Sequence, residues 1–271
     1  MGDNRPIGIF DSGLGGLTVV NAMAKILPEE SYIYVGDTAR CPYGGKDVNT
    51  IRAYAQQIVA FLQKKDVKAV IVACGTISSN VMDDLWENFD LPIIDVVRPG
   101  IESCLQLCEA QNKKRVGVIA TETTIKSGFF QMMLKEKSPA LDVEAKACPL
   151  FVPLIEEGWI NNTVTISVVE AYLKSWQKNP IDALILGCTH YPLLTPVLKK
   201  VLENVVQIDM ASVTLETARK YLTENDMLKN VKELSDKISK AFYVSGDTEK
   251  FNKMGQQITG VSISAQKIFW E

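Results

Sequence analysis

The chain has 271 residues, an apolar fraction of 46%, a charged fraction of 23% and a formal net charge of -3, values typical of a soluble globular protein with one or two domains. The slight acidic excess argues against a nucleic-acid partner, because nucleic-acid binders usually carry a basic excess. No stretch approaches the ~20 apolar residues that cross a bilayer, and the apolar run at Ile7 meets Asp11 too soon for a signal peptide. We therefore expect a cytoplasmic protein without a membrane segment.

Short apolar, β-branched runs alternate with longer segments of helical spacing. The expected strands are residues 7–10, 32–35, 69–73, 93–97, 116–120, 183–186, 205–208 and 242–244, with 143–147 as a weaker candidate. Segments such as 49–64, 163–177 and 214–223 have helical spacing. Apolar runs without alternation indicate strands covered on both faces. Alternation of strands with helices indicates parallel sheets. The pattern therefore predicts an α/β protein.

The chain also repeats itself weakly. Residues 7–12 resemble 116–121, and residues 69–76 resemble 183–190, in the same order and at nearly the same spacing. Parallel strands resemble one another, but that does not explain why the second run of each half, 69–76 and 183–190, ends in a cysteine followed by small polar residues. We predict two similar α/β halves, the first comprising residues 1–98 plus 210–271 and the second 99–209. Arg98-Pro99-Gly100 is interpreted as the crossover between them.

The loop after the first expected strand reads Asp11-Ser12-Gly13-Leu14-Gly15-Gly16-Leu17-Thr18. Sites in such sheets form at the carboxyl ends of strands, and glycines there let backbone N–H groups approach an anion. The loop lacks the ending of a phosphate-binding Walker A motif, and Asp11 would repel a phosphate. A small substrate with both an ammonium and a carboxylate group suits it better. The alternative is an ordinary strand–helix turn in which Asp11 is a cap.

Two cysteines end equivalent strands of the predicted halves, in Cys74-Gly75-Thr76 and Cys188-Thr189-His190. A thiol at a helix N-terminus is expected to have a lowered pKa because its thiolate meets the positive end of the helix dipole. The alternative for either cysteine alone is an inert core residue, and a Cys–His pair is also compatible with a hydrolase nucleophile. A third loop, residues 36–44, is either a rigid surface turn or a cover over the site.

If the two halves face each other, both thiols flank one cleft. That arrangement suits removal of a proton from one face of a carbon and delivery of a proton to the other. The unperturbed thiol pKa of ~8.5 is close enough to neutrality for one cysteine to be thiolate while the other is thiol. The single histidine and the lack of clustered cysteines exclude the usual zinc motifs. We therefore expect no zinc site.

Five segments together resemble the glutamate racemase family of the aspartate/glutamate racemase superfamily. They occur in the family's order and are residues 7–18, 36–44, 73–76, 151–156 and 186–193. The late Ser245-Gly246-Asp247 is similar to the family's C-terminal strand end. The resemblance covers nearly the whole chain and implies two flavodoxin-like α/β/α half-domains with the site between them.

The resemblance implies racemisation of L-glutamate to D-glutamate by direct proton transfer at the α-carbon, without cofactor or metal, to supply D-glutamate for peptidoglycan in cell-wall biogenesis. By matched motif, Cys74 and Cys188 would be catalytic, assisted by Asp11 and His190 respectively. Asp37 and Glu156 match supporting carboxylates. The residues implied to line the substrate site are Asp11, Ser12, Tyr43, Gly44, Gly75, Thr76, Thr121, Thr189 and His190. The resemblance also suggests a homodimer.

Gly75 departs from the family, which usually has Ala-Cys-Asn-Thr where this chain has Ala73-Cys74-Gly75-Thr76. The change removes an amide that would bind substrate, but it lets the loop approach more closely. An alternative hypothesis is therefore a racemase of the same superfamily that acts on aspartate or another amino acid. A second alternative is a non-catalytic amino-acid-binding regulator, although binding alone requires neither thiol.

Overall fold

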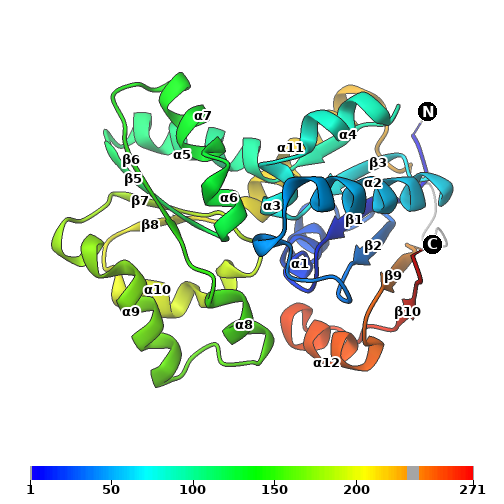
Figure 1. The fold of residues 1–271 in the computed structure, drawn as a ribbon. Helices are drawn as coiled ribbons and strands as arrows, with labels where there is room; N and C mark the ends of the chain where they lie inside the picture. The colour runs from blue at the N-terminus through cyan, green and yellow to red at the C-terminus, as the bar shows by residue number, and fades with distance from the viewer. Residues whose placement is uncertain (1, 231–237, 271) are drawn as a thin grey trace.

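The computed structural model describes residues 2–230 and 238–270 and contains two parallel β-sheets (Figure 1). The first sheet has the order β10-β9-β2-β1-β3-β4, formed by β1 (Ile7–Asp11), β2 (Tyr32–Gly36), β3 (Ala69–Val72), β4 (Ile93–Asp95), β9 (Lys240–Val244) and β10 (Ala265–Lys267). The second sheet has the order β6-β5-β7-β8, formed by β5 (Arg115–Ala120), β6 (Asp142–Ala147), β7 (Ala183–Leu186) and β8 (Val206–Ile208). All the pairings between these strands are parallel.

Helices connect the strands. They are α1 (Leu17–Ile26), α2 (Val48–Lys64), α3 (Gly75–Ser78), α4 (Met82–Asn88), α5 (Val97–Ala110), α6 (Glu122–Lys126), α7 (Phe129–Lys137), α8 (Phe151–Glu156), α9 (Thr163–Lys178), α10 (Thr195–Val201), α11 (Met210–Glu224), α12 (Thr248–Thr259) and the 3-10 turns η1 (Tyr43–Gly45) and η2 (Tyr191–Leu194). Several begin at side-chain caps: Asp47, Asn162 and Asp247 each accept a hydrogen bond from a backbone N–H in the first turn.

The two sheets share one topology, which confirms the predicted fold class. The order β2-β1-β3-β4 in the first sheet is repeated as β6-β5-β7-β8 in the second. In each, the strand order reverses beside the first strand, which is the switch point where ligands bind in open α/β sheets. Asp11 and Cys74 lie at the switch point of the first sheet, and Thr121 and Cys188 at that of the second. The sequence repeat therefore reflects a structural repeat.

Both faces of each sheet are covered, because alternate residues of a strand enter different apolar clusters. In β1 and β3 the side chains of Ile9 and Ile71 join one cluster, while Phe10 and Val72 join another. The second sheet behaves in the same way, with Val118 in the first cluster and Ile119 in a third. This burial explains why the strands read as continuous apolar runs.

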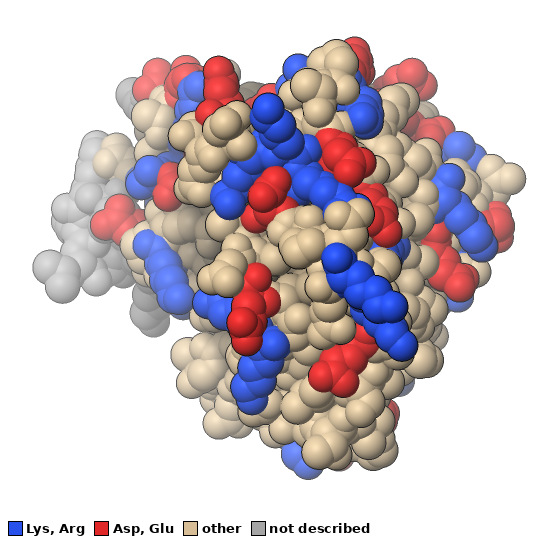
Figure 2. Space-filling model, turned by 90° about the vertical axis from the view of Figure 1, so that its left-hand side faces the viewer, with Lys and Arg blue, Asp and Glu red and all other residues tan. Residues whose placement is uncertain are grey.

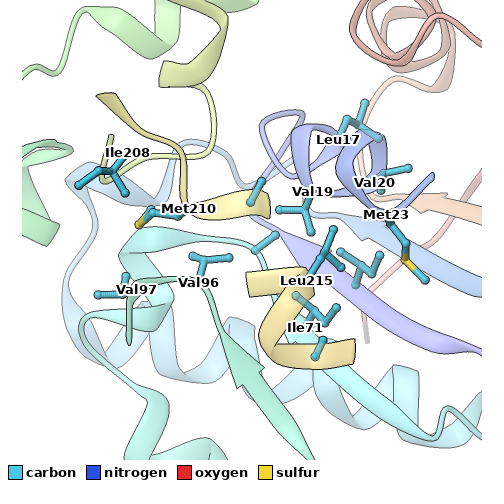
Figure 3. Packing of buried hydrophobic residues seen from close by; sticks show 14 of the residues in the cluster. Leu17, Val19, Val20, Met23, Ile71, Val96, Val97, Ile208, Met210 and Leu215 are labelled. Atoms are coloured by element: carbon cyan, nitrogen blue, oxygen red, sulfur yellow. The ribbon is translucent and has the colours of Figure 1, made fainter. Parts of the chain in front are cut away.

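One apolar cluster extends across both sheets. Helix α11 packs against both α1 and α5. Figure 3 shows Met210 and Leu215 of α11 lying between Ile208 and the α1 residues Leu17 and Met23. This shared apolar core holds the two halves together along α1, α5 and α11. The division into residues 1–98 plus 210–271 and 99–209 stays a prediction.

The structure corrects one expected feature and adds another. Arg98-Pro99-Gly100 lies on the connection between the two sheets, in the first turn of α5, which links β4 to β5. Proline fits there since the first N–H groups of a helix have no intrahelical partner. Strand β4 accordingly ends at Asp95, two residues before its predicted end. The short edge strand Ala265–Lys267 was not predicted.

On the outer face of the second half, acidic and basic side chains are interspersed (Figure 2). Arg115, for example, pairs with both Asp142 and Glu144. None of the helices within residues 2–230 and 238–270 combines the length and apolar character needed to cross a membrane.

Candidate active site

Asp11 at the end of β1 organises the glycine loop that follows it. Its carboxylate is fully buried and accepts hydrogen bonds from the backbone N–H groups of Gly13 at 3.2 Å and Gly16 at 2.9 Å. It therefore serves as a local cap, as the interpretation of the loop as a strand–helix turn predicts. It also faces the second half, because the Thr189 hydroxyl donates to its other oxygen at 3.4 Å.

Gly15 shows how closely this loop approaches the second half. A Cβ atom added to Gly15 would lie 2.4 Å from Nδ1 of His190 and 2.5 Å from the hydroxyl of Thr189. A Cβ atom does not come that close to unbonded heavy atoms, so any side chain at position 15 would displace Thr189 and His190. The loop and the end of β7 thus form opposite walls of one space.

Cys74 follows β3 and precedes the single-turn helix α3, with 4% of its surface exposed. Its thiol donates to the hydroxyl of Ser12 at 3.6 Å. Burial and the nearby Asp11 carboxylate raise the pKa of Cys74 to about 12, although the Ile77 N–H and Ser12 partly offset them. The expected lowering of the pKa is therefore wrong for Cys74, since one helical turn does not outweigh desolvation without a cation. Cys74 is a thiol at neutral pH.

Cys188 follows β7 and has a different environment. Its sulfur lies 3.8 Å from Nδ1 of His190, whose Nε2 lies 3.1 Å from a Glu156 oxygen. Burial lowers the pKa of His190, but its bonds to Cys188 and Glu156 outweigh burial and raise that pKa to about 10. The pKa of Glu156 is lowered, because its bond to the His190 ring and the charge of that ring outweigh burial. A charged imidazolium therefore lies beside Cys188.

The two sulfurs belong to one site. The negative charge of a Cys188 thiolate contributes to the raised pKa of Cys74, which places the two groups within electrostatic range of each other. Their loops touch directly, since a Cβ atom on Gly75 would lie 2.4 Å from the carbonyl oxygen of Gly187. Cys188 is only 7% exposed. A substrate therefore reaches the thiols only when the two halves part.

Three hydroxyls from both halves meet next to the thiols. Thr76 and Thr121 lie 2.9 Å apart, and Thr124 lies 3.0 Å from Thr121 and 3.3 Å from Thr76. Sequence reasoning singled out Thr76 and Thr121 but missed Thr124. Its position three residues after Thr121, on the same face of a helical turn, was the available signal.

Asp37, on the loop after β2, is the centre of a group of hydrogen bonds behind the site. It is fully buried and accepts hydrogen bonds from Tyr43, from Arg40 at 2.6 Å, from Ser245 at 2.6 Å and from Trp270 at 2.7 Å. These bonds attach the loop 36–44 to the C-terminal part of the first half. Ser245 belongs to the predicted C-terminal strand end.

The far end of that loop reaches the second half. A Cβ atom on Gly44 would lie 2.4 Å from Cβ of Thr121. The loop therefore contacts the second half at Thr121, which favours its interpretation as a cover over the site.

Every site residue predicted from the sequence thus lies at the contact between the two halves or is hydrogen-bonded to a residue at that contact. Glu156 contacts His190 and also accepts a hydrogen bond from the thiol of Cys41 at 3.7 Å. Among the described residues no group of three or more His, Cys, Asp or Glu side chains is placed to hold a metal ion. The arrangement brings two thiols together with the hydroxyls of Thr76 and Thr121 at the contact between the two halves.

Comparisons with known proteins agree with one another. Residues 8–218 match the Asp/Glu/hydantoin racemase family. The chain is 39% identical over 261 residues to glutamate racemase 2 of Caldanaerobacter subterraneus, with 96% of each chain covered. It is 40% identical to glutamate racemase of Neisseria meningitidis serogroup C, covering 96% of this chain and 94% of that one. The crystal structure of Francisella tularensis glutamate racemase with D-glutamate superposes with a TM-score of 0.90, at 38% identity and with 99% of each chain covered.

Proposed function

The chain belongs to the Asp/Glu/hydantoin racemase family, and we propose that it interconverts L- and D-glutamate by moving the α-proton between Cys74 and Cys188. The observation that supports the proposal is the pair of buried thiols at equivalent strand ends, on loops that contact each other at Gly75 and Gly187. A hydrolase needs one nucleophilic thiol, and a binding protein needs none. Inversion at a carbon needs an acid/base group on each side.

In one direction the Cys188 thiolate removes the α-proton. The C–H bond breaks, an S–H bond forms, and the electron pair stays on the α-carbon. The Cys74 thiol then delivers its proton to the opposite face and becomes a thiolate. The charged His190 ring beside Cys188 and the thiol state of Cys74 favour this starting arrangement. Proton exchange restores it after each turnover.

The developing carbanion needs fixed donors and a water-free site, because the α-hydrogen of an amino acid is a weak acid. The closed halves exclude water, since both thiols are less than a tenth exposed. We assign substrate contacts to the residues already predicted: Asp11, Ser12, Tyr43, Gly44, Gly75, Thr76, Thr121, Thr189 and His190. Asp37 and Glu156 hold these groups through Tyr43 and His190 respectively.

The test follows the α-proton of L-glutamate in deuterated water with no added cofactor. We expect the α-proton signal to disappear while the optical rotation falls to zero. Folded enzyme that leaves both unchanged contradicts the proposal. Aspartate and other amino acids run in parallel identify the substrate, and racemisation of aspartate with glutamate inert supports the alternative that Gly75 suggested.

Three finer expectations go with this proposal. D-glutamate from this enzyme would supply peptidoglycan synthesis, the enzyme would act in the cytoplasm, and it would form a homodimer. Depletion of the protein in its own cells should produce a growth defect that added D-glutamate relieves. Sedimentation at micromolar concentration distinguishes a dimer from a monomer.

A further inference from the structure

The hydroxyl of Thr123 makes a contact between the two halves that the proposed chemistry does not use. Thr123 lies on α6 of the second half and is half-buried. Its hydroxyl lies 2.9 Å from the carbonyl oxygen of Gly44 and 3.1 Å from that of Lys46, both on the first half. It has one proton, so it donates to one of these carbonyls at a time. Gly44 lies within the turn η1, and Lys46 follows it directly.

This contact forms a thin wall of the site. On its inner side Gly44 lies against Thr121, one of the three clustered hydroxyls. On its outer side is a hollow of about 490 Å³, lined by Thr123 itself and by charged residues that include Lys46 and Lys126. A single layer of loop and side chain therefore separates solvent from the groups assigned to the substrate.

The two halves are held together by apolar contacts on one side of the site and by polar contacts at the hollow. On the side of α1, α5 and α11 a continuous apolar cluster joins both sheets, and parting it would expose apolar surface to water. At the hollow the halves meet through polar contacts between η1 and α6, which water can replace at low net cost. Opening at the Thr123 contact therefore exposes less apolar surface than opening along the shared apolar cluster.

We propose that Thr123 is a positioning residue that latches the loop 43–46 onto α6, and that glutamate passes through this wall when the latch opens. The loop is then held by both halves. Asp37 of the first half binds Tyr43, and Thr123 of the second half binds Gly44. Closing fixes Gly44 against Thr121, and this completes the site. The inference rests on the proposed function, because it assigns a route to the same substrate.

Alkylation of the two buried thiols by iodoacetamide measures opening without relying on activity. In Thr123→Val, which keeps the shape but lacks the donor, we expect Cys74 and Cys188 to react about 3- to 10-fold faster, the factor for one net hydrogen bond. The matched control is Thr217→Val, because the Thr217 hydroxyl bonds only to Val213 within α11. Thr123→Ser keeps the hydroxyl and should react like the wild type.

Cys104 is fully buried in the apolar cluster on α5 and serves as an internal reference. Equal acceleration at all three thiols would mean general loosening and would overturn the latch, as would an unchanged rate at Cys74 and Cys188. In the racemisation assay Thr123→Val should raise KM for glutamate more than it changes kcat, with rescue by Thr123→Ser. A wild-type protein that fails to racemise glutamate refutes the proposed function, whereas the alkylation rates still decide on the latch.

Discussion

The ends of β3 and β7 carry the same residue at the same place in one repeated topology, but in unlike surroundings. Cys188 has the charged ring of His190 at 3.8 Å, backed by Glu156. Cys74 has the hydroxyl of Ser12 at 3.6 Å and the Asp11 carboxylate nearby, and burial raises its pKa to about 12. The repeat thus supplies two thiols at equivalent strand ends, while their neighbours give each thiol a different electrostatic environment. A two-base reaction needs that inequality, because one thiol must donate while the other accepts.

The largest expected effect comes from removing either thiol. Cys74→Ala and Cys188→Ala should each lower racemisation by about 10³-fold or more, because one face of the α-carbon then has no acid/base group. The remaining thiol should still exchange the α-proton with solvent while retaining configuration. We expect Cys74→Ala to exchange one enantiomer of glutamate and Cys188→Ala to exchange the other, measured by the α-proton signal of each enantiomer in deuterated water.

Exchange of the same enantiomer by both variants would place the two sulfurs on one side of the substrate. Cys104→Ala is a matched control, because Cys104 is a buried thiol in the apolar core on α5. Its activity per folded molecule should equal that of the wild type.

The second-largest expected effect tests the difference between the neighbours of Cys188 and those of Cys74. His190→Asn removes the positive charge beside Cys188 and should lower kcat/KM by about 10²-fold. The loss is equal in both directions, since the equilibrium constant between enantiomers is one. Ser12→Ala removes only a hydroxyl beside Cys74 and should cost about 10-fold. Initial rates with each enantiomer test this order, and a larger loss in Ser12→Ala would reverse our assignment of the resting thiolate to Cys188.

The third effect concerns the contact between the two loops. Gly75→Ala would place a methyl group 2.4 Å from the Gly187 carbonyl, so the loops carrying the thiols must separate. A misplacement of about 1 Å can cost as much as about 10²-fold in rate, and we expect a loss between 10-fold and 10²-fold. Gly45→Ala is the matched control, since nothing lies within 4 Å of its added methyl. Equal rates for Gly75→Ala and the wild type would show that the halves need not approach so closely.

The smallest expected effect is on the free energy of unfolding, and it arises from the interaction between His190 and Glu156. The His190 pKa is raised from 6.5 to about 10, so its stabilisation is complete below about pH 6.5 and lost as the pH rises through about 10. The Glu156 pKa is lowered from 4.5, so its stabilisation is present above about pH 4.5 and lost as the pH falls through the lower value in the folded protein. The combined contribution is therefore greatest between about pH 4.5 and 6.5.

Glu156→Gln should lower the free energy of unfolding by about 1–3 kcal/mol near pH 5.5. This is less than the roughly 3–5 kcal/mol of a fully buried pair, because the Glu156 side chain is 25% exposed. Urea unfolding at pH 5.5 and pH 9.5 should show the gap between variant and wild type narrowing at the higher pH. A gap that widens at pH 9.5 would contradict the charged state assigned to His190.

The amino-acid sequence alone specifies the fold class, the repeat and the composition of the site. Apolar strands buried on both faces and helices of period 3.6 are encoded locally, and each functional segment follows a recognisable strand end. For that reason residues as far apart as Asp11 and Cys188 can be assigned to one cleft from their positions in the chain. The departure at Gly75 likewise predicts a close approach of backbone, and the contact with Gly187 identifies its partner.

The inequality of the thiols, in contrast, arises only on folding. Two similar motifs, each a cysteine before small polar residues, predict the same lowered pKa, but burial beside Asp11 raises the pKa of Cys74 while His190 and Glu156 place a positive charge beside Cys188. The partners of Thr123 and Thr124 across the two halves were also not predicted, because these contacts join segments separated by dozens of residues. Desolvation and charge depend on distances between such segments, and those distances exist only in the folded chain.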